Sequence, residues 1–187
     1  MINLTTKNRA QAGNFTVEFA IVGVVFALLL VFTSDLVVKL ATHGKLDRMS
    51  FSAVSILKER TQFSSQHDIV PLTPIEVDNV YRIVERSLAR TVGNFDENKL
   101  GFVVEEQRFN SNGQALPLST IHASMHSAGC TLKQSLHSMQ NLSLKSSWGR
   151  RFTLYRVTVC YQTENWFGDL VGKTFNSVSS SSVIMGR

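Results

Sequence analysis

One uncharged apolar run near the N-terminus decides most of what this chain can fold into. From residue 19 the sequence reads FAIVGVVFALLLVF, and a second short apolar run, residues 36–38, follows Thr33, Ser34 and Asp35. A helix of about 20 mainly apolar residues is long enough to cross the hydrocarbon core of a bilayer. No other run of this kind occurs in the 187 residues, so the sequence predicts a single membrane crossing.

The helical pattern continues beyond this run. Gly44 is a weak point, costing about 1 kcal/mol relative to alanine in a helix interior. We nevertheless predict one helix over residues 14–62, which would be about 70 Å long at about 1.5 Å per residue. Its first half can lie in lipid, and the rest must stand in water or pack on a domain. The apolar residues that continue the helical spacing, with charges between them, are Val37, Leu40, Met49, Ala53 and Leu57.

Residues 63–187 are predicted to form a small α+β domain. A turn-rich stretch, residues 64–74, leads into a second helix, which begins at the capping box Thr73-Pro74-Ile75-Glu76 and ends near Gly93. The apolar residues Val77, Val80, Val84 and Leu88 follow at helical spacing in this segment.

Strand patterns follow the second helix. Strands are predicted over residues 100–109, 152–162 and 174–185, with a tight turn at Asn112-Gly113. The serines of the last strand are expected to face water. Residues 119–149 give mixed signals and are predicted to be loop, with room for one short helix. The fold class is therefore α+β, with a long transmembrane and stalk helix, one capped helix and an antiparallel sheet.

The charge and cysteine content narrow the possible partners and compartment. The formal net charge is +5, but the basic residues do not cluster beyond Arg150-Arg151, so nucleic-acid binding is not predicted. The two cysteines, Cys130 and Cys160, would form one disulfide if this region lies in an oxidising compartment. Two reduced, buried thiols are the alternative.

The apolar run contains one unexpected carboxylate, Glu18, near its start. An acid in lipid costs a few kcal/mol unless another group pairs with it. If the chain is cut between Gly13 and Asn14, a new α-amino group lies four residues from Glu18, about one helical turn. That amine could neutralise Glu18 in its own helix or in the helix of a neighbouring subunit.

These residues carry a resemblance to a known family. Gly13, with Glu18 five positions later and Phe19 after it, resembles the prepilin-peptidase site of type IV pilins, and the glutamate-aromatic pair is closest to the tight-adherence (Tad/Flp) branch. The additional domain resembles that of the longer TadE/TadF minor pseudopilins. The ending, with Cys160-Tyr161, a serine-rich strand and residues 184–187, is similar to TadF.

The resemblance implies three parts and a set of partners. Residues 1–13 would be a leader removed by a membrane aspartic peptidase, residues 14–62 the transmembrane and stalk helix, and residues 63–187 a periplasmic domain. The N-terminus would be cytoplasmic and the chain would sit in the bacterial inner membrane. Implied partners are other pilin and pseudopilin subunits, the prepilin peptidase, the Tad inner-membrane assembly platform and membrane lipid.

Two positions depart from the family pattern. Asn14 stands where other pilin branches carry phenylalanine, so the resemblance gives no prediction for N-methylation. Phe19 stands where the Flp motif usually has tyrosine, so a role for that hydroxyl is absent. The alternative reading is a plain signal anchor that carries a single-pass, membrane-anchored binding or scaffolding domain. The basic residues flanking the run on both sides do not settle its orientation.

Enzymatic and metal-binding patterns are weak. Residues 168–174, GDLVGKT, are one residue short of a phosphate-binding loop and are predicted to be a turn between strands. His122, His126 and Cys130 have a spacing that zinc ligands could use, but Ser127-Ala128-Gly129 is poor helix and Cys130 has a competing partner. We therefore predict a structural protein that is not an enzyme and has no cofactor and no metal. The aromatic residues Trp148, Trp166 and Phe167 are predicted to pack in the core.

Overall fold

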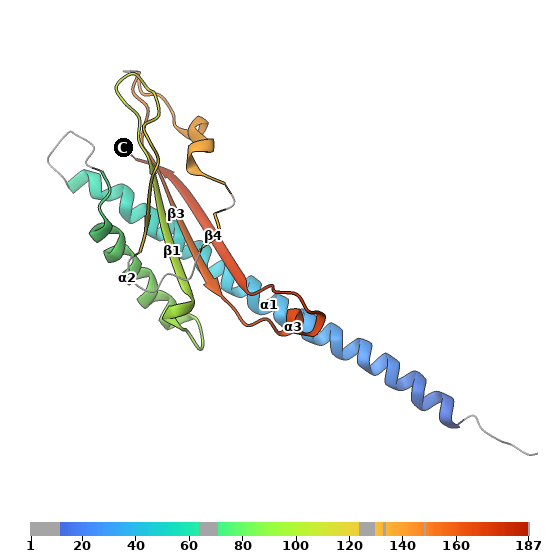
Figure 1. Cartoon of the computed structure of the whole chain (residues 1–187). Helices are drawn as coiled ribbons and strands as arrows, with labels where there is room; N and C mark the ends of the chain where they lie inside the picture. The colour runs from blue at the N-terminus through green and yellow to red at the C-terminus, as the bar shows by residue number, and fades with distance from the viewer. Residues whose placement is uncertain (1–11, 64–70, 124–129, 133, 148, 187) are drawn as a thin grey trace, which may run out of the picture.

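A long helix runs through the whole molecule and carries a small domain on its C-terminal half (Figure 1). The computed structural model describes residues 12–63, 71–123, 130–132, 134–147 and 149–186. Helix α1 spans Ala12–Phe63, so the long N-terminal helix expected from the sequence is confirmed. The helix passes through Gly44 without interruption.

Helix α2, Pro74–Thr91, follows the predicted capping box closely. The Thr73 hydroxyl accepts a hydrogen bond from the backbone N–H of Glu76, and the Glu76 carboxylate accepts one from the backbone N–H of Thr73, at 2.8 Å. Two of the amide groups that a helix start leaves without partners are thereby bonded. The predicted apolar face is buried: Val77, Val80, Val84 and Leu88, together with Tyr81.

The sheet has four antiparallel strands in the spatial order β2-β1-β3-β4. The strands are β1 (Leu100–Gln107), β2 (Ser119–His122), β3 (Leu154–Gln162) and β4 (Ser177–Met185). The α+β class and the three predicted strands are confirmed. The predicted turn lies at residues 110–113, where the Gly113 N–H bonds to the Asn110 carbonyl and Gly113 has φ of 75°.

Residues 119–149 were only partly predicted. They contain the predicted short helix, the 3₁₀ segment η2 (Leu136–Leu142), but also strand β2, which the sequence did not indicate. Two further short segments were not expected: the 3₁₀ turn η1 (Glu97–Lys99) and helix α3 (Trp166–Val171). The four residues of β2 are too few for a clear alternation, and the strand forms because β1 offers it a pairing edge.

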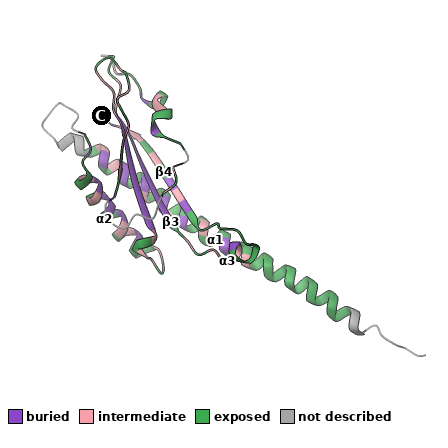
Figure 2. Ribbon diagram, in the orientation of Figure 1, coloured by how far each residue is buried: buried purple, intermediate pink, exposed green. Residues whose placement is uncertain are grey.

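The hydrophobic core lies between the sheet and the two long helices. Figure 2 shows the buried strands and the buried faces of α1 and α2 meeting in this layer. Tyr81 of α2 contacts Phe102 of β1 edge to face, with ring centroids 6.0 Å apart. Core residues from α1 are Leu46, Ala53, Val54 and Leu57, and those from the sheet include Leu100, Phe102, Val104, Tyr155, Val157 and Val159.

The expectation that the β4 serines face water is wrong for Ser180 and Ser182, which face α1. Ser180 is buried, and its hydroxyl donates to the Asp47 carboxylate on α1 at 3.0 Å. Ser182 lies 2.8 Å from the Ser50 hydroxyl of α1. Small polar side chains let the helix lie close to this edge strand, and polar residues on α1 supply the hydrogen bonds that water would otherwise make.

Candidate functional site

The first half of α1 projects from the domain with an apolar surface on all sides. Figure 2 shows this part exposed along its length. Within the part of the chain that the structure describes, α1 is the one helix long and apolar enough to cross a membrane. We call residues 15–32 the span. Its exposed apolar side chains are Phe15, Val17, Phe19, Ile21, Val22, Val24, Val25, Phe26, Leu28, Leu29, Leu30 and Phe32.

The residues predicted for processing and assembly lie at the start of this surface. Gly13 and Asn14 are in the first turn of α1, which begins at Ala12, and residues 1–11 of the predicted leader lie outside the described residues. Glu18 is exposed about one turn further along the helix. The rings of Phe15 and Phe19 stack beside it, with centroids 6.5 Å apart. The predicted residues therefore share two consecutive turns of one helix.

The polar end of the span is formed by Thr33 and Asp35. The Thr33 hydroxyl donates to the Leu29 carbonyl at 2.9 Å, so it adds no unsatisfied polar group to the helix surface. The carboxylate of Asp35 is buried and accepts a hydrogen bond from the Lys39 ammonium at 2.5 Å. The next charged residue after Glu18 is therefore neutralised by an ion pair at the junction with the domain.

The two predicted disulfide residues lie on the sheet face away from α1 and α2. Cys130 and Cys160 are joined by a disulfide with Cα atoms 5.8 Å apart, across 30 positions of sequence. Cys160 is within β3, so the bond fastens the less regular segment, residues 119–149, to this strand at Cys130.

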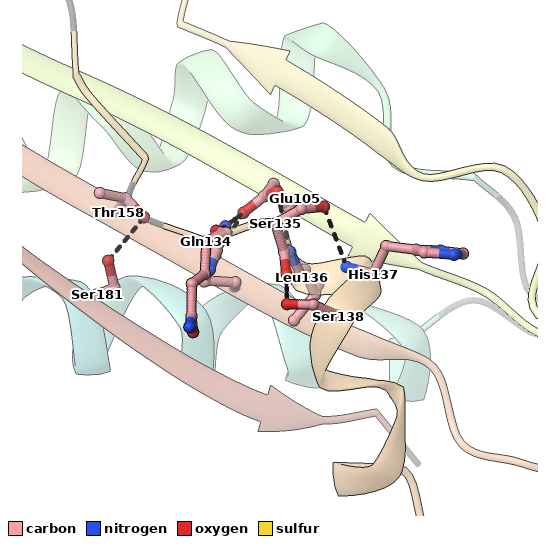
Figure 3. A network of polar contacts seen from close by, with 9 residues as sticks. Glu105, Gln134, Ser135, Leu136, His137, Ser138, Thr158 and Ser181 are labelled. Atoms are coloured by element: carbon pink, nitrogen blue, oxygen red, sulfur yellow. Dashed lines mark hydrogen bonds and ion pairs between the residues drawn. The ribbon is translucent and has the colours of Figure 1, made fainter.

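A polar network on the same face holds the rest of that segment (Figure 3). The Glu105 carboxylate forms a buried ion pair with Arg156, which lies opposite it on the neighbouring strand. Glu105 also accepts from the Leu136 N–H at 3.3 Å, and Arg156 donates to the Gln134 carbonyl at 2.5 Å. Both charged groups are thereby paired and bonded to the covering loop, as a buried ion pair requires.

Two groups of the domain, Tyr81 and Lys99, have pKa values raised further above neutral pH. Burial raises the pKa of Tyr81 to about 12, with the charges of Glu85 and Glu97 adding to the effect. The hydrogen bond from Lys99 to Glu164 raises the pKa of Lys99. Tyr81 therefore stays neutral and Lys99 stays cationic throughout the physiological range.

The weak zinc pattern is not assembled. Cys130 is taken by the disulfide, His122 is exposed on β2, and His126 lies outside the described residues. No group of three metal-ligating side chains that could hold an ion occurs among the described residues. The nucleotide-like segment GDLVGKT lies in the connection between β3 and β4, as predicted. It includes the end of α3 and leads into a strand, whereas a phosphate-binding loop would lead into a helix.

The prediction that the late aromatics pack in the core is wrong for both Trp166 and Phe167. Trp166 is 52% exposed, and Phe167 is half-buried outside the core, where it packs edge to face on Phe32 of the span with centroids 4.9 Å apart. Trp148 lies outside the described residues. The sequence could not predict the different exposure of Trp166 and Phe167, because it depends on which of the two side chains faces α1.

A comparison with protein families decides the identity of the chain. The model of one family, TadF, described as putative tight adherence pilin protein F, matches residues 6–187. The chain belongs to the TadF family. The match includes both the span and the domain, so the resemblance predicted from residues 9–33 and from the ending is confirmed. No curated protein and no solved structure gives a significant match.

Membership of the TadF family gives the exposed half of α1 a role. A pilin family is structural, and its members associate with other subunits of the pilus. The span is then the anchor that holds this TadF protein in a membrane. A helix that is apolar on all sides needs lipid or other apolar surface around it.

Proposed function

We propose that this TadF protein is a minor pseudopilin that takes part in assembling a tight adherence pilus. The observation that carries the proposal is an exposed apolar span that begins two residues after Gly13 and contains one carboxylate, Glu18. In lipid, Glu18 costs about 3 kcal/mol when it stands without an opposite charge. A chain that needed its helix as an anchor alone would gain nothing from that cost.

Cleavage between Gly13 and Asn14 places a new positive charge about one helical turn from Glu18. Gly13 is in the first turn of α1 and has no side chain, so its backbone can take the extended form that fits a narrow peptidase cleft. The new α-amino group at Asn14 lies about 6 Å from Glu18 along the helix axis. It pairs with Glu18 of its own chain or of a neighbouring subunit, and this pairing fixes the register between helices.

The domain belongs, in this proposal, in the periplasm. A disulfide between Cys130 and Cys160 forms and persists in an oxidising compartment, which supports placing residues 63–187 there. The basic leader, with Lys7 and Arg9, then remains on the cytoplasmic side, where the prepilin peptidase removes it. The inner-membrane assembly platform and the other pilin subunits are the remaining partners.

The test compares two acids of the same helix in a strain that makes tight adherence pili. Glu18→Ala removes the carboxylate proposed to pair during assembly, and Glu59→Ala removes an exposed carboxylate in the half of α1 beside the domain. We expect both variants to insert and to be cleaved normally. Piliation and adherence should be lost with Glu18→Ala and retained with Glu59→Ala, at equal membrane levels by immunoblot.

A second variant separates processing from assembly. Replacing Gly13 with a bulky residue, Gly13→Val, should block cleavage and leave the leader attached, again without pili. An anchored binding or scaffolding domain predicts the opposite, because an anchor needs only its apolar length. Normal pili from Glu18→Ala and Gly13→Val at normal levels would contradict the proposed function.

A further inference from the structure

The connection between β3 and β4, residues 163–176, forms an ordered loop organised around Asn165. The Asn165 amide donates to the Asp169 carboxylate at 2.7 Å and to the Lys173 carbonyl at 2.8 Å. Its side-chain carbonyl accepts from the Phe175 N–H at 2.8 Å. The loop is closed at its base by the Thr163 N–H bonding to the Asn176 carbonyl. These bonds fix the backbone on both sides of α3.

The two glycines of GDLVGKT are explained by this loop. A Cβ on Gly168 would lie 2.1 Å from the Asn165 side-chain oxygen and 2.3 Å from the Lys173 carbonyl, so no larger residue fits. Gly172 ends α3 in a left-handed conformation, with φ of 66°, which glycine adopts without strain. The hydrogen bonds within the loop therefore fix its backbone conformation.

The loop lies against the domain end of the span. Figure 1 places α3 beside α1 where the helix leaves the domain. The contact is made by Phe167 on Phe32, the last residue of the apolar run. Residues 15–32 rise by about 27 Å, slightly less than the roughly 30 Å thickness of a hydrocarbon core. The edge of the bilayer therefore reaches the level of α3.

The loop turns its apolar side chains outward. The exposed fractions are 52% for Trp166, 60% for Leu170, 47% for Val171 and 54% for Phe175. An ordered loop that shows four large apolar side chains to water loses the free energy of burying them. Their surface continues that of the span through the contact of Phe167 with Phe32. We call these four residues the loop patch.

We propose that the loop patch lies in the interfacial region of the bilayer leaflet on the domain's side. Tryptophan prefers this depth because its ring is apolar and its N–H is polar. Lys173 is exposed next to the patch, where its long side chain can reach lipid phosphates while its stem stays apolar. Two points of contact with lipid, the span and the loop patch, fix how the domain is tilted and rotated on the membrane.

This inference rests on the insertion of the span and not on cleavage at Gly13 or on a role in pilus assembly. The occupant is a lipid surface. A second copy of the chain, or another subunit, covering the loop patch is an alternative outcome of the test.

The test measures the depth of Trp166 in vesicles that contain the full chain. Trp148→Phe leaves Trp166 as the sole tryptophan, and the vesicles contain phosphatidylcholine brominated either near the headgroup or near the chain end. A matched reporter, Ile83→Trp, is placed in a chain without the two native tryptophans, because Ile83 is also 52% exposed but lies on α2. Co-flotation with the vesicles checks that the span has inserted.

We expect the Trp166 emission to be quenched by bromines near the headgroup more than by those near the chain end, and only weakly by aqueous acrylamide. The Ile83→Trp reporter should be quenched strongly by acrylamide and only weakly by bromines at either position. Trp166 quenched by acrylamide as fully as the reporter, or protected from both quenchers by another protein copy, would overturn the proposal. A chain that does not float would overturn the insertion on which it rests. If Trp148→Phe lowers Tm, the difference between the wild-type chain and Trp166→Phe gives the same comparison.

Discussion

The two halves of α1 belong to one uninterrupted helix but meet different surroundings. In the span every large apolar side chain except Val31 is at least 42% exposed, whereas Leu46, Ala53, Val54 and Leu57 in the second half are at most 1% exposed. The span is apolar on all sides, and the second half buries one face against the sheet. One helix can therefore lie in two environments when its apolar residues change from covering all sides to covering one face. Here the change occurs at Thr33 and Asp35.

Substituting a carboxylate should show the largest difference in stability between the domain and the span. Glu105 in the domain is buried and paired with Arg156, whereas Glu18 in the span is exposed. Glu105→Ala leaves the Arg156 guanidinium buried without its carboxylate, so we expect the free energy of unfolding to fall by about 3–5 kcal/mol. Urea unfolding of the detergent-solubilised protein, followed by circular dichroism, measures this.

Two acids serve as controls for Glu105. Glu18→Ala should leave the unfolding of the domain unchanged, because the span makes no part of the core. Glu164→Ala removes a solvent-exposed partner of Lys99 and should change Tm little. A Glu105→Ala protein as stable as these controls would show that the polar network does not hold the covering segment to the sheet.

Matched leucines test the two halves of the helix directly. Leu57 is 1% exposed in the core and Leu29 is 52% exposed in the span. We expect Leu57→Ala to lower the free energy of unfolding by about 2–4 kcal/mol through lost burial and a cavity. Leu29→Ala should have no measurable effect on the same transition. Equal losses from both variants would break the division of α1 into two parts.

The capping box of α2 gives the smallest predicted effect. Thr73→Ala removes the side-chain acceptor for the Glu76 N–H, so we expect a loss of about 1 kcal/mol. The matched control is Thr33→Ala at the end of the span, because the Thr33 hydroxyl bonds to carbonyls of its own helix. That variant should leave Tm of the domain unchanged, and a larger loss there than at Thr73 would contradict the comparison.

Local patterns made much of this architecture predictable. The apolar run, the capping box at Thr73 and the alternation of residues 152–162 each specify an element through interactions within a few residues, and all three elements are present. The last strand was also predictable from its flanking apolar residues, although not the burial of Ser180. That burial depends on Asp47, 133 positions away.

The remaining features depend on tertiary contacts that a sequence pattern does not contain. Strand β2 needs the edge of β1, and α3 needs the bonds of Asn165 and the contact of Phe167 with Phe32. For the candidate site, the structure places Gly13, Asn14, Glu18 and Phe19 in two consecutive turns of α1, and their roles in processing and assembly stay predictions. The exposed position of Trp166 was not predictable, because residue type alone favours its burial.

The most direct test of the central claim is the mass of the mature chain. The protein is extracted from membranes of cells that contain the prepilin peptidase, and processing of the major pilin in the same cells shows that the peptidase is active. We predict a species that begins at Asn14, having lost residues 1–13. Full-length chain alone in those cells would contradict the pseudopilin function and favour a plain membrane anchor.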